Sequence, residues 1–276
     1  MSCRVCDRRR NNAGILFASA MIAGLTMNPA AGQNGLPAGF VYLRDVDPSI
    51  AQDIRYAGSD NFVGRPLAGY EGPECILRQE AAAALKRVQA ELVPLGLSLK
   101  VYDCYRPTRA VQSMAAWAND GRSQSATKRF FPKLPKNALF SLGYIASRSQ
   151  HSTGRAVDLT LIPAAGAPAP AFEPSAAYAP CTGPAAQRSP DNSVDMGTGF
   201  DCFDVKSHTA SGGISAEQRR WRSTLGDAMR KQGFANYHRE WWHFTYVRSG
   251  HASQHDFPIR PRALRPHADE PVAQRR

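Results

Sequence analysis

The chain has 276 residues, of which 43% are hydrophobic and 21% charged, so it holds enough apolar sequence to bury a core and is not a disordered polymer. The one long apolar run, residues 13–27, is shorter than the about 20 residues that a membrane helix needs, which excludes a multi-span membrane protein. The formal net charge of +11 bears on solubility and non-specific contacts, and by itself it does not indicate a nucleic-acid partner.

Residues 1–32 have the order of a secretory signal peptide. Four arginines precede the apolar run, and Asn28-Pro29 followed by small residues comes after it. We therefore predict that this segment is removed and that the mature protein is exported and periplasmic. We also predict that the protein has no stable insertion in the membrane after signal cleavage.

The cysteine count agrees with export. Two of the six cysteines lie in the predicted signal peptide, and the remaining four are Cys75, Cys104, Cys181 and Cys202. An even count in an exported chain favours two disulfides, for which three pairings exist. The pairs Cys75–Cys104 and Cys181–Cys202 each close a short local loop, so we favour this pairing. The alternative is four buried free thiols.

The N-terminal half of the remaining chain predicts an irregular opening, a helix, a strand and a second helix. Residues 40–75 are rich in Gly, Pro, Asp and aromatic residues, which predicts strands and turns. Residues 78–93 have the pattern of an amphipathic helix, and Pro94-Leu95-Gly96 ends it. The alternating residues 97–104 predict a strand, and Arg106-Pro107 opens a helix that runs to about residue 119.

The C-terminal half alternates regular elements with irregular segments. Gly154 precedes a strand at residues 155–162, and residues 163–190 hold 7 Pro and 10 Ala, which predicts a surface insert. Residues 215–231 predict a helix capped by Ser215, and residues 241–247 predict a strand. Residues 258–276 predict a disordered basic tail without a nucleic-acid recognition motif. From these elements we predict one domain over residues 33–257.

A histidine and a carboxylate lie seven residues apart in the segment 149–158. On one continuous strand they would face opposite sides, because seven is odd. Gly154 allows a tight turn after His151, so that His151 can lie on a loop while Asp158 projects from the strand that follows. Both side chains could then reach one metal ion. The alternative is that His151 is an ordinary hydrogen-bonded histidine.

The segment 240–244 offers a third ligand in His243. Glu240 is three residues away and would face the other side of a regular strand, so we expect it in the turn just before the strand. Two histidines and one aspartate leave one position of a tetrahedral zinc ion open, and a carboxylate beside that position suits a general base. The alternative is that His243 packs among core aromatic residues.

Arg106 lies where a predicted strand ends and a predicted helix begins. This position is suited to entering a cleft, where the guanidinium could hold the oxyanion that forms when water attacks a carbonyl. The alternative is a surface arginine paired with a carboxylate, which is the commoner situation.

Together, these segments resemble the VanX-type D-alanyl-D-alanine dipeptidases, a group of zinc peptidases that also contains bacterial D,D-carboxypeptidases. The resemblance rests on S-x-H-x-x-G-x-A-x-D at residues 149–158, E-W-W-H at 240–243 and Y-D-x-Y-R-P at 102–107. Further matches run from about Val41 to Val247, among them the sequences at residues 53–57, 60–66 and 200–201.

The resemblance implies the fold, the cofactor and the site. The implied fold is α+β, with a small central antiparallel sheet flanked by helices and a zinc site on one sheet face. One Zn²⁺ per chain is implied. The implied residues are the zinc ligands His151, Asp158 and His243, the general base Glu240, the oxyanion-stabilising Arg106, and the substrate contacts Ser149, Asp201 and Tyr56.

The implied reaction is hydrolysis of the small D,D-dipeptide D-Ala-D-Ala to two D-alanines, in cell-wall peptide turnover. Two other functions remain open. A D,D-carboxypeptidase acting on peptidoglycan stem peptides is disfavoured by the Y-D-x-Y-R-P and Phe200-Asp201 features. A non-catalytic protein that binds cell-wall peptides is disfavoured by Glu240 and Arg106, because binding alone needs neither. The sequence carries no signal for an oligomeric state.

The predicted Cys181–Cys202 bridge bears on the substrate pocket. Cys202 directly follows Asp201, so the bridge would tether the 163–190 insert beside the carboxylate that reads the substrate amine. We expect this bridge to fix the end wall of the pocket.

Overall fold

The computed structural model describes residues 35–122, 125–250 and 252–262. The predicted signal peptide, residues 1–32, and residues 263–276 of the predicted tail lie outside the described residues. Among the residues that are described, no helix combines the length and the apolar character needed to cross a bilayer.

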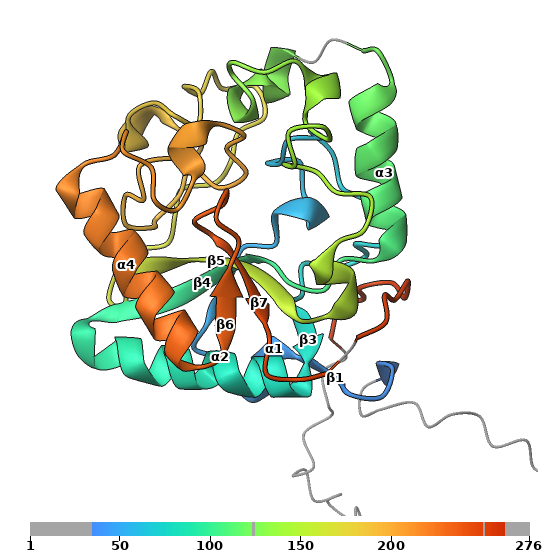
Figure 1. The fold of residues 1–276 in the computed structure, drawn as a ribbon, viewed down its shortest axis with the longest axis vertical. Helices are drawn as coiled ribbons and strands as arrows, with labels where there is room; N and C mark the ends of the chain where they lie inside the picture. The colour runs from blue at the N-terminus through green and yellow to red at the C-terminus, as the bar shows by residue number, and fades with distance from the viewer. Residues whose placement is uncertain (1–34, 123–124, 251, 263–276) are drawn as a thin grey trace, which may run out of the picture. The chain divides into compact units, whose positions relative to one another are not determined.

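A five-stranded mixed sheet lies at the centre of the fold, in the order β2-β4-β5-β7-β6 (Figure 1). Its strands are β2 (Ala51–Gln52), β4 (Leu97–Asp103), β5 (Ala156–Pro163), β6 (Phe234–Asn236) and β7 (His243–Tyr246). The pairs from β4 to β6 are antiparallel, but the edge strand β2 is parallel to β4. The α+β fold is confirmed, and the predicted antiparallel sheet differs only at its edge, where β2 is parallel to β4. The chain returns from β2 to β4 through a helix, as a parallel pair requires.

Two helices cover the sheet and contact each other. They are α2 (Gln79–Leu92) and α4 (Ala216–Lys231), which lie side by side in Figure 1. Each helix buries an apolar stripe, with Leu85 and Val88 on α2 and Leu225 and Met229 on α4. Ser215 caps α4 through a reciprocal capping box, because its side chain accepts from Gln218 N. The helices predicted at residues 78–93 and 215–231 are therefore confirmed.

Smaller elements complete the domain. A second sheet pairs β1 (Phe40–Tyr42) with β3 (Ile76–Arg78), α1 (Leu43–Val46) follows β1, and α3 (Thr108–Asn119) follows β4. Both predicted disulfides are confirmed: Cys75–Cys104 joins the start of β3 to the end of β4, and Cys181–Cys202 joins the insert to the loop that carries Asp201.

The predicted insert is irregular but firmly anchored where it ends. Within residues 163–190 the helical structure is a single short 3₁₀ turn at Ala185–Gln187. Just beyond it, Asp191 accepts from Lys100 Nζ at 2.6 Å and from the Tyr102 hydroxyl at 2.6 Å, and it pairs with Arg55 at 3.2 Å. Lys100 and Arg55 are buried, so this network fixes the segment to β4 with charge-assisted hydrogen bonds.

The structure describes the first residues of the predicted tail, 258–262, and one of them packs against the domain. Ile259 is fully buried and bridges to Tyr70, and the Phe257 ring stacks on Tyr105 with centroids 4.1 Å apart. The Pro- and Arg-rich composition concealed the apolar anchor Ile259, which buries surface that a free tail would expose. The start of the predicted tail therefore packs against the domain at Ile259.

Candidate metal centre and active site

The register of three neighbouring strands brings distant polar residues into one row. Asp103 on β4 pairs with Asp158 on β5, and Asp158 pairs with His243 on β7. A β-bulge between Val101 and Asp103 sets this register, because a regular ladder would place Tyr102 opposite Asp158. Directly paired residues point to the same face of a sheet, so the three side chains converge.

The turn that carries His151 has the geometry that the sequence predicts. His151 lies in the short 3₁₀ turn Gln150–Thr153, where the Ser149 hydroxyl accepts from the His151 backbone N–H at 3.2 Å. Gly154 ends the turn in the left-handed conformation, with φ of 75°. A Cβ atom there would also collide with the Phe40 ring, so glycine is required on both counts.

The three predicted metal ligands converge on one point. His151 Nε2 lies 3.2 Å from Asp158 Oδ1, His243 Nδ1 lies 3.0 Å from the same oxygen, and the two nitrogens are 3.1 Å apart. A tetrahedral zinc ion with bonds of about 2.0–2.1 Å keeps its ligand atoms about 3.3 Å apart. Small outward shifts of these three side chains would therefore make room for a zinc ion. Among the described residues, this group of His and Asp side chains could hold a metal.

Hydrogen bonds behind the ligands set their chemical state. His151 Nδ1 donates to the Cys104 carbonyl at 2.7 Å, which turns the bare Nε2 toward the cluster. Burial lowers the pKa of His243, so its ring is neutral, as a metal ligand must be. Burial opposes ionisation of Asp158, but the two histidines outweigh it and hold the pKa of this carboxyl below its usual range.

Glu240 lies beside the three candidate metal ligands but is not one of them. It lies between β6 and β7, three residues before His243, where the strand begins, so its expected place in the turn is confirmed, although β7 begins later than residue 241. Its Oε2 is 3.9 Å from His243 Nδ1. Burial, followed by the charges of Asp158 and Asp201, raises the pKa of Glu240 well above its ordinary value. A carboxyl with a raised pKa holds a proton more readily than an ordinary glutamate, which favours a role in proton transfer.

Arg106 is held by a carboxylate that sequence reasoning missed. Its Nε and Nη2 donate to Asp103 Oδ2 at 2.9 and 2.8 Å, and Nη2 lies 3.6 Å from Asp158 Oδ2. Asp103 is fully buried and also accepts from the Tyr70 hydroxyl at 2.6 Å. The sequence did offer a signal for this contact, because Asp103 lies three residues before Arg106 in the same motif. The contact of Nη1 is with Met114 Sδ at 3.8 Å, which leaves this nitrogen able to meet a substrate oxygen.

Asp201 is a further carboxyl group of the site, and Tyr56 is hydrogen-bonded to it. The Tyr56 hydroxyl donates to Asp201 Oδ2 at 2.7 Å, and the Tyr56 ring receives the Arg106 guanidinium 4.9 Å from its centroid. Asp201 has φ of 54°, the one positive value at a non-glycine position among the described residues. Burial, followed by the charge of Asp158, raises the pKa of Asp201 to about 8. A buried, strained carboxyl of this kind is a marker of function.

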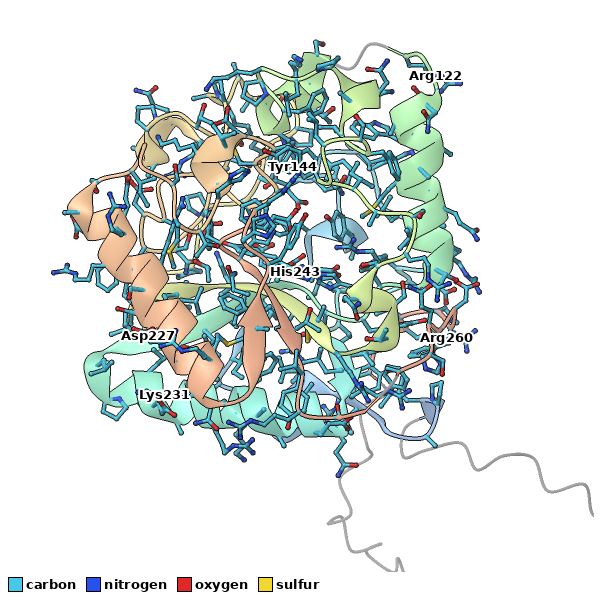
Figure 2. All side chains as sticks on the ribbon, viewed as in Figure 1. Arg122, Tyr144, Asp227, Lys231, His243 and Arg260 are labelled. Atoms are coloured by element: carbon cyan, nitrogen blue, oxygen red, sulfur yellow. A yellow bond between two sulfur atoms is a disulfide. The ribbon has the colours of Figure 1, made fainter. Side chains whose placement is uncertain are left out.

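All eight predicted site residues line one cavity of about 260 Å³. Figure 2 labels two of the side chains that border it, His243 and Tyr144. Sequence reasoning missed Tyr144 and Arg148, which also border the cavity, because neither lies in the three motifs. Ser149 borders the cavity while its hydroxyl supports the His151 turn, and its contact with substrate stays a prediction.

Comparisons with known proteins find similar sequences over most of the chain. Residues 37–170 and 176–259 match the family described as D-ala-D-ala dipeptidase. The chain is 32% identical over 223 residues to the D-alanyl-D-alanine dipeptidase of Enterococcus faecium, with 80% of this chain and 98% of that protein aligned. It is 33% identical over 221 residues to the dipeptidase of Streptomyces coelicolor, with the same coverage of 80% and 98%. The Escherichia coli dipeptidase is 28% identical over 204 residues, covering 74% and 82%.

Proposed function

This chain belongs to the D-Ala-D-Ala dipeptidase family of peptidases, and from this premise we propose that it is a zinc enzyme that hydrolyses D-Ala-D-Ala to two D-alanines. One observation carries the proposal. The ligand atoms of His151, Asp158 and His243 lie 3.0 to 3.2 Å apart beside Glu240, in a cavity small enough for a dipeptide.

The donor set fits zinc, because two neutral imidazoles and one carboxylate are a common catalytic zinc set with a further position open. When bound, a zinc ion supplies Lewis-acid chemistry, which polarises a carbonyl and acidifies water. Glu240 takes the proton from the attacking water and returns it to the leaving amine. Its raised pKa suits both steps, because the carboxyl readily holds a proton between them.

Arg106 acts on the charge that develops at the scissile carbonyl. Its Nη2 is engaged by Asp103, while Nη1 can donate to the oxygen that becomes negative. The ion pair with Asp103 holds the guanidinium in place before substrate arrives, so little reorganisation is needed during the reaction.

Asp201 supplies a carboxylate for the substrate ammonium. A cation beside it would favour its ionised form, which offsets the burial and like-charge repulsion that raise its pKa. The Tyr56 hydroxyl holds one carboxyl oxygen and leaves the other for the amine. This recognition supports a substrate with a free amino terminus over an internal stretch of a longer peptide, because a mismatched buried charge is costly.

We also propose that the enzyme is exported and acts in the turnover of cell-wall peptides. The two disulfides support an oxidising compartment, because such bonds are rare in the cytosol. Cell fractionation and mass measurement of the mature N-terminus test this. Export predicts a periplasmic protein that begins near residue 32, and a cytoplasmic protein that keeps residue 1 would contradict it.

The substrate proposal is tested by incubating the zinc-loaded protein with D-Ala-D-Ala, L-Ala-L-Ala and a pentapeptide that ends in D-Ala-D-Ala. We expect efficient release of D-alanine from the first substrate alone. We also expect Glu240→Ala to abolish turnover while keeping the metal. Equal cleavage of all three substrates would contradict the dipeptidase proposal, and cleavage of the pentapeptide alone would favour a D,D-carboxypeptidase.

A further inference from the structure

A free dipeptide carries a carboxylate as well as an ammonium. The proposed function gives the ammonium a partner in Asp201 but leaves the carboxylate without a cation, and the present inference rests on that proposed function. An enzyme that prefers a free carboxyl terminus needs a positive group at the matching distance, because an unmatched charge disfavours binding.

Two cationic side chains border the cavity among the described residues, Arg106 and Arg148. Arg106 is already committed, because Asp103 accepts from two of its nitrogens and Asp158 lies 3.6 Å away. Its side chain is only 12% exposed, and the proposed function already assigns it to the reacting carbonyl. Arg106 is therefore poorly placed to hold the terminal carboxylate as well.

Arg148 differs from Arg106 in its exposure and in its contacts. It is exposed, it borders the cavity, and its guanidinium makes no hydrogen bond or ion pair with any residue of the described ranges. It directly precedes Ser149, whose hydroxyl supports the turn of the metal ligand His151. The backbone of Arg148 thus adjoins the hydrogen-bonded turn that carries His151, while its charged end is available to solvent and ligand.

The charged groups on the cavity wall favour one orientation of a zwitterionic dipeptide. Asp158, Asp201 and Glu240 are the carboxyl groups that border the cavity, and the two carboxyls outside the ligand set, Asp201 and Glu240, are buried. A substrate carboxylate is repelled by these groups and attracted by an exposed guanidinium, so amine inward and carboxylate outward is the favoured arrangement. Arginine suits this role because its planar fork donates two parallel hydrogen bonds to one carboxylate.

We propose that Arg148 binds the C-terminal carboxylate of the dipeptide at the mouth of the cavity and sets the preference for substrates with a free carboxyl terminus. It is a specificity residue, since it touches the substrate and not the scissile bond. Its removal therefore weakens substrate binding and leaves the chemical step nearly unchanged.

The test compares D-Ala-D-Ala with its C-terminal amide, which has the same peptide bond and no terminal charge. For Arg148→Ala we expect KM for the free acid to rise about tenfold, which corresponds to about 1.4 kcal/mol, with kcat little changed. Kinetics on the amide should stay as in the wild type, and Arg148→Lys should retain part of the preference for the acid. Arg122→Ala is the matched control, because Arg122 is exposed and lies far from His243 in Figure 2.

A second measurement does not depend on turnover. Calorimetric binding of D-Ala-D-Ala to the Glu240→Ala protein should weaken about tenfold when Arg148→Ala is added. An unchanged acid-to-amide ratio in Arg148→Ala, in an enzyme that cleaves the dipeptide, would overturn the role of Arg148 and leave the proposed function intact. Binding that depends on Arg148 in a wild type that does not cleave the dipeptide would support Arg148 and contradict the proposed hydrolysis.

Discussion

The substitution Asp103→Asn tests whether Arg106 is held in place by a buried ion pair. Asp103 has no exposed surface, accepts from two nitrogens of Arg106, and accepts from the Tyr70 hydroxyl. Asparagine keeps the shape and one acceptor oxygen but removes the charge. Asp103 is not among the ligand atoms of the metal cluster, but its Oδ2 lies 3.3 Å from His151 Nδ1, so zinc content is measured together with the kinetics.

The expected loss can be worked from the contacts. A hydrogen bond to a charged group contributes about 1.5–3 kcal/mol, against about 0.5–1.5 kcal/mol for a neutral one, so two weakened bonds lower the free energy of unfolding by about 2 kcal/mol. Loss of one oxyanion donor costs about 10²- to 10³-fold in kcat, and a displaced Arg106 should approach that loss. KM should change much less, because Arg106 acts on the developing charge.

The assay combines steady-state kinetics, urea unfolding and metal analysis on the same protein. Asp53→Asn is the matched control, because Asp53 pairs with Arg55 at 2.8 Å but is 39% exposed and does not border the cavity. We expect the control to keep its kcat. If Asp103→Asn loses less than about threefold in kcat while Arg106→Ala loses about 100-fold, the claim that Asp103 positions Arg106 is refuted.

Other contacts bear on the pH dependence of stability, on the Cys181–Cys202 bridge and on the turn at Gly154. In the metal-free protein, burial raises the pKa of Asp201 to about 8, while an unfolded aspartate ionises near about 4. Between about pH 4 and pH 8 the native state therefore binds one proton more than the unfolded state. The free energy of unfolding should fall as pH rises through this range and level off above about pH 8. Urea unfolding checks this, and an Asp201→Asn variant with the wild-type pH slope would contradict it. Replacing both Cys181 and Cys202 by serine should lower stability by about 3 kcal/mol and raise KM for the dipeptide; unchanged turnover and zinc content would remove the role of the bridge in the pocket wall. Gly154→Ala should cost at least about 1–2 kcal/mol and weaken metal binding, because the left-handed turn also contacts Phe40; a zinc titration equal to wild type would contradict this.

The local features of the site could be predicted from the sequence. Gly154 marks the turn that separates His151 from Asp158, and Glu240 precedes β7 as the odd spacing to His243 requires. Ser215 marks the start of α4, and the short loops between cysteines indicate both disulfides. Each of these depends on neighbours in the chain, whose geometry the residue types constrain directly.

The features that the sequence did not predict are non-local. The bulge that places Asp103 opposite Asp158 depends on the register between β4 and β5, which no single segment encodes. The bond from Tyr70 to Asp103 joins residues 33 positions apart, and the bridge from Tyr70 to Ile259 joins a loop to the predicted tail. The parallel direction of β2 likewise depends on the path of the chain through α2.

The central claim is that His151, Asp158 and His243 hold one catalytic zinc ion beside Glu240. It is tested most directly by measuring zinc per chain together with dipeptide turnover in the wild type, His151→Ala and Glu240→Gln. The account predicts one zinc ion and turnover in the wild type, loss of both in His151→Ala, and one zinc ion without turnover in Glu240→Gln. Full zinc content in His151→Ala, or turnover that survives complete removal of metal, would contradict it.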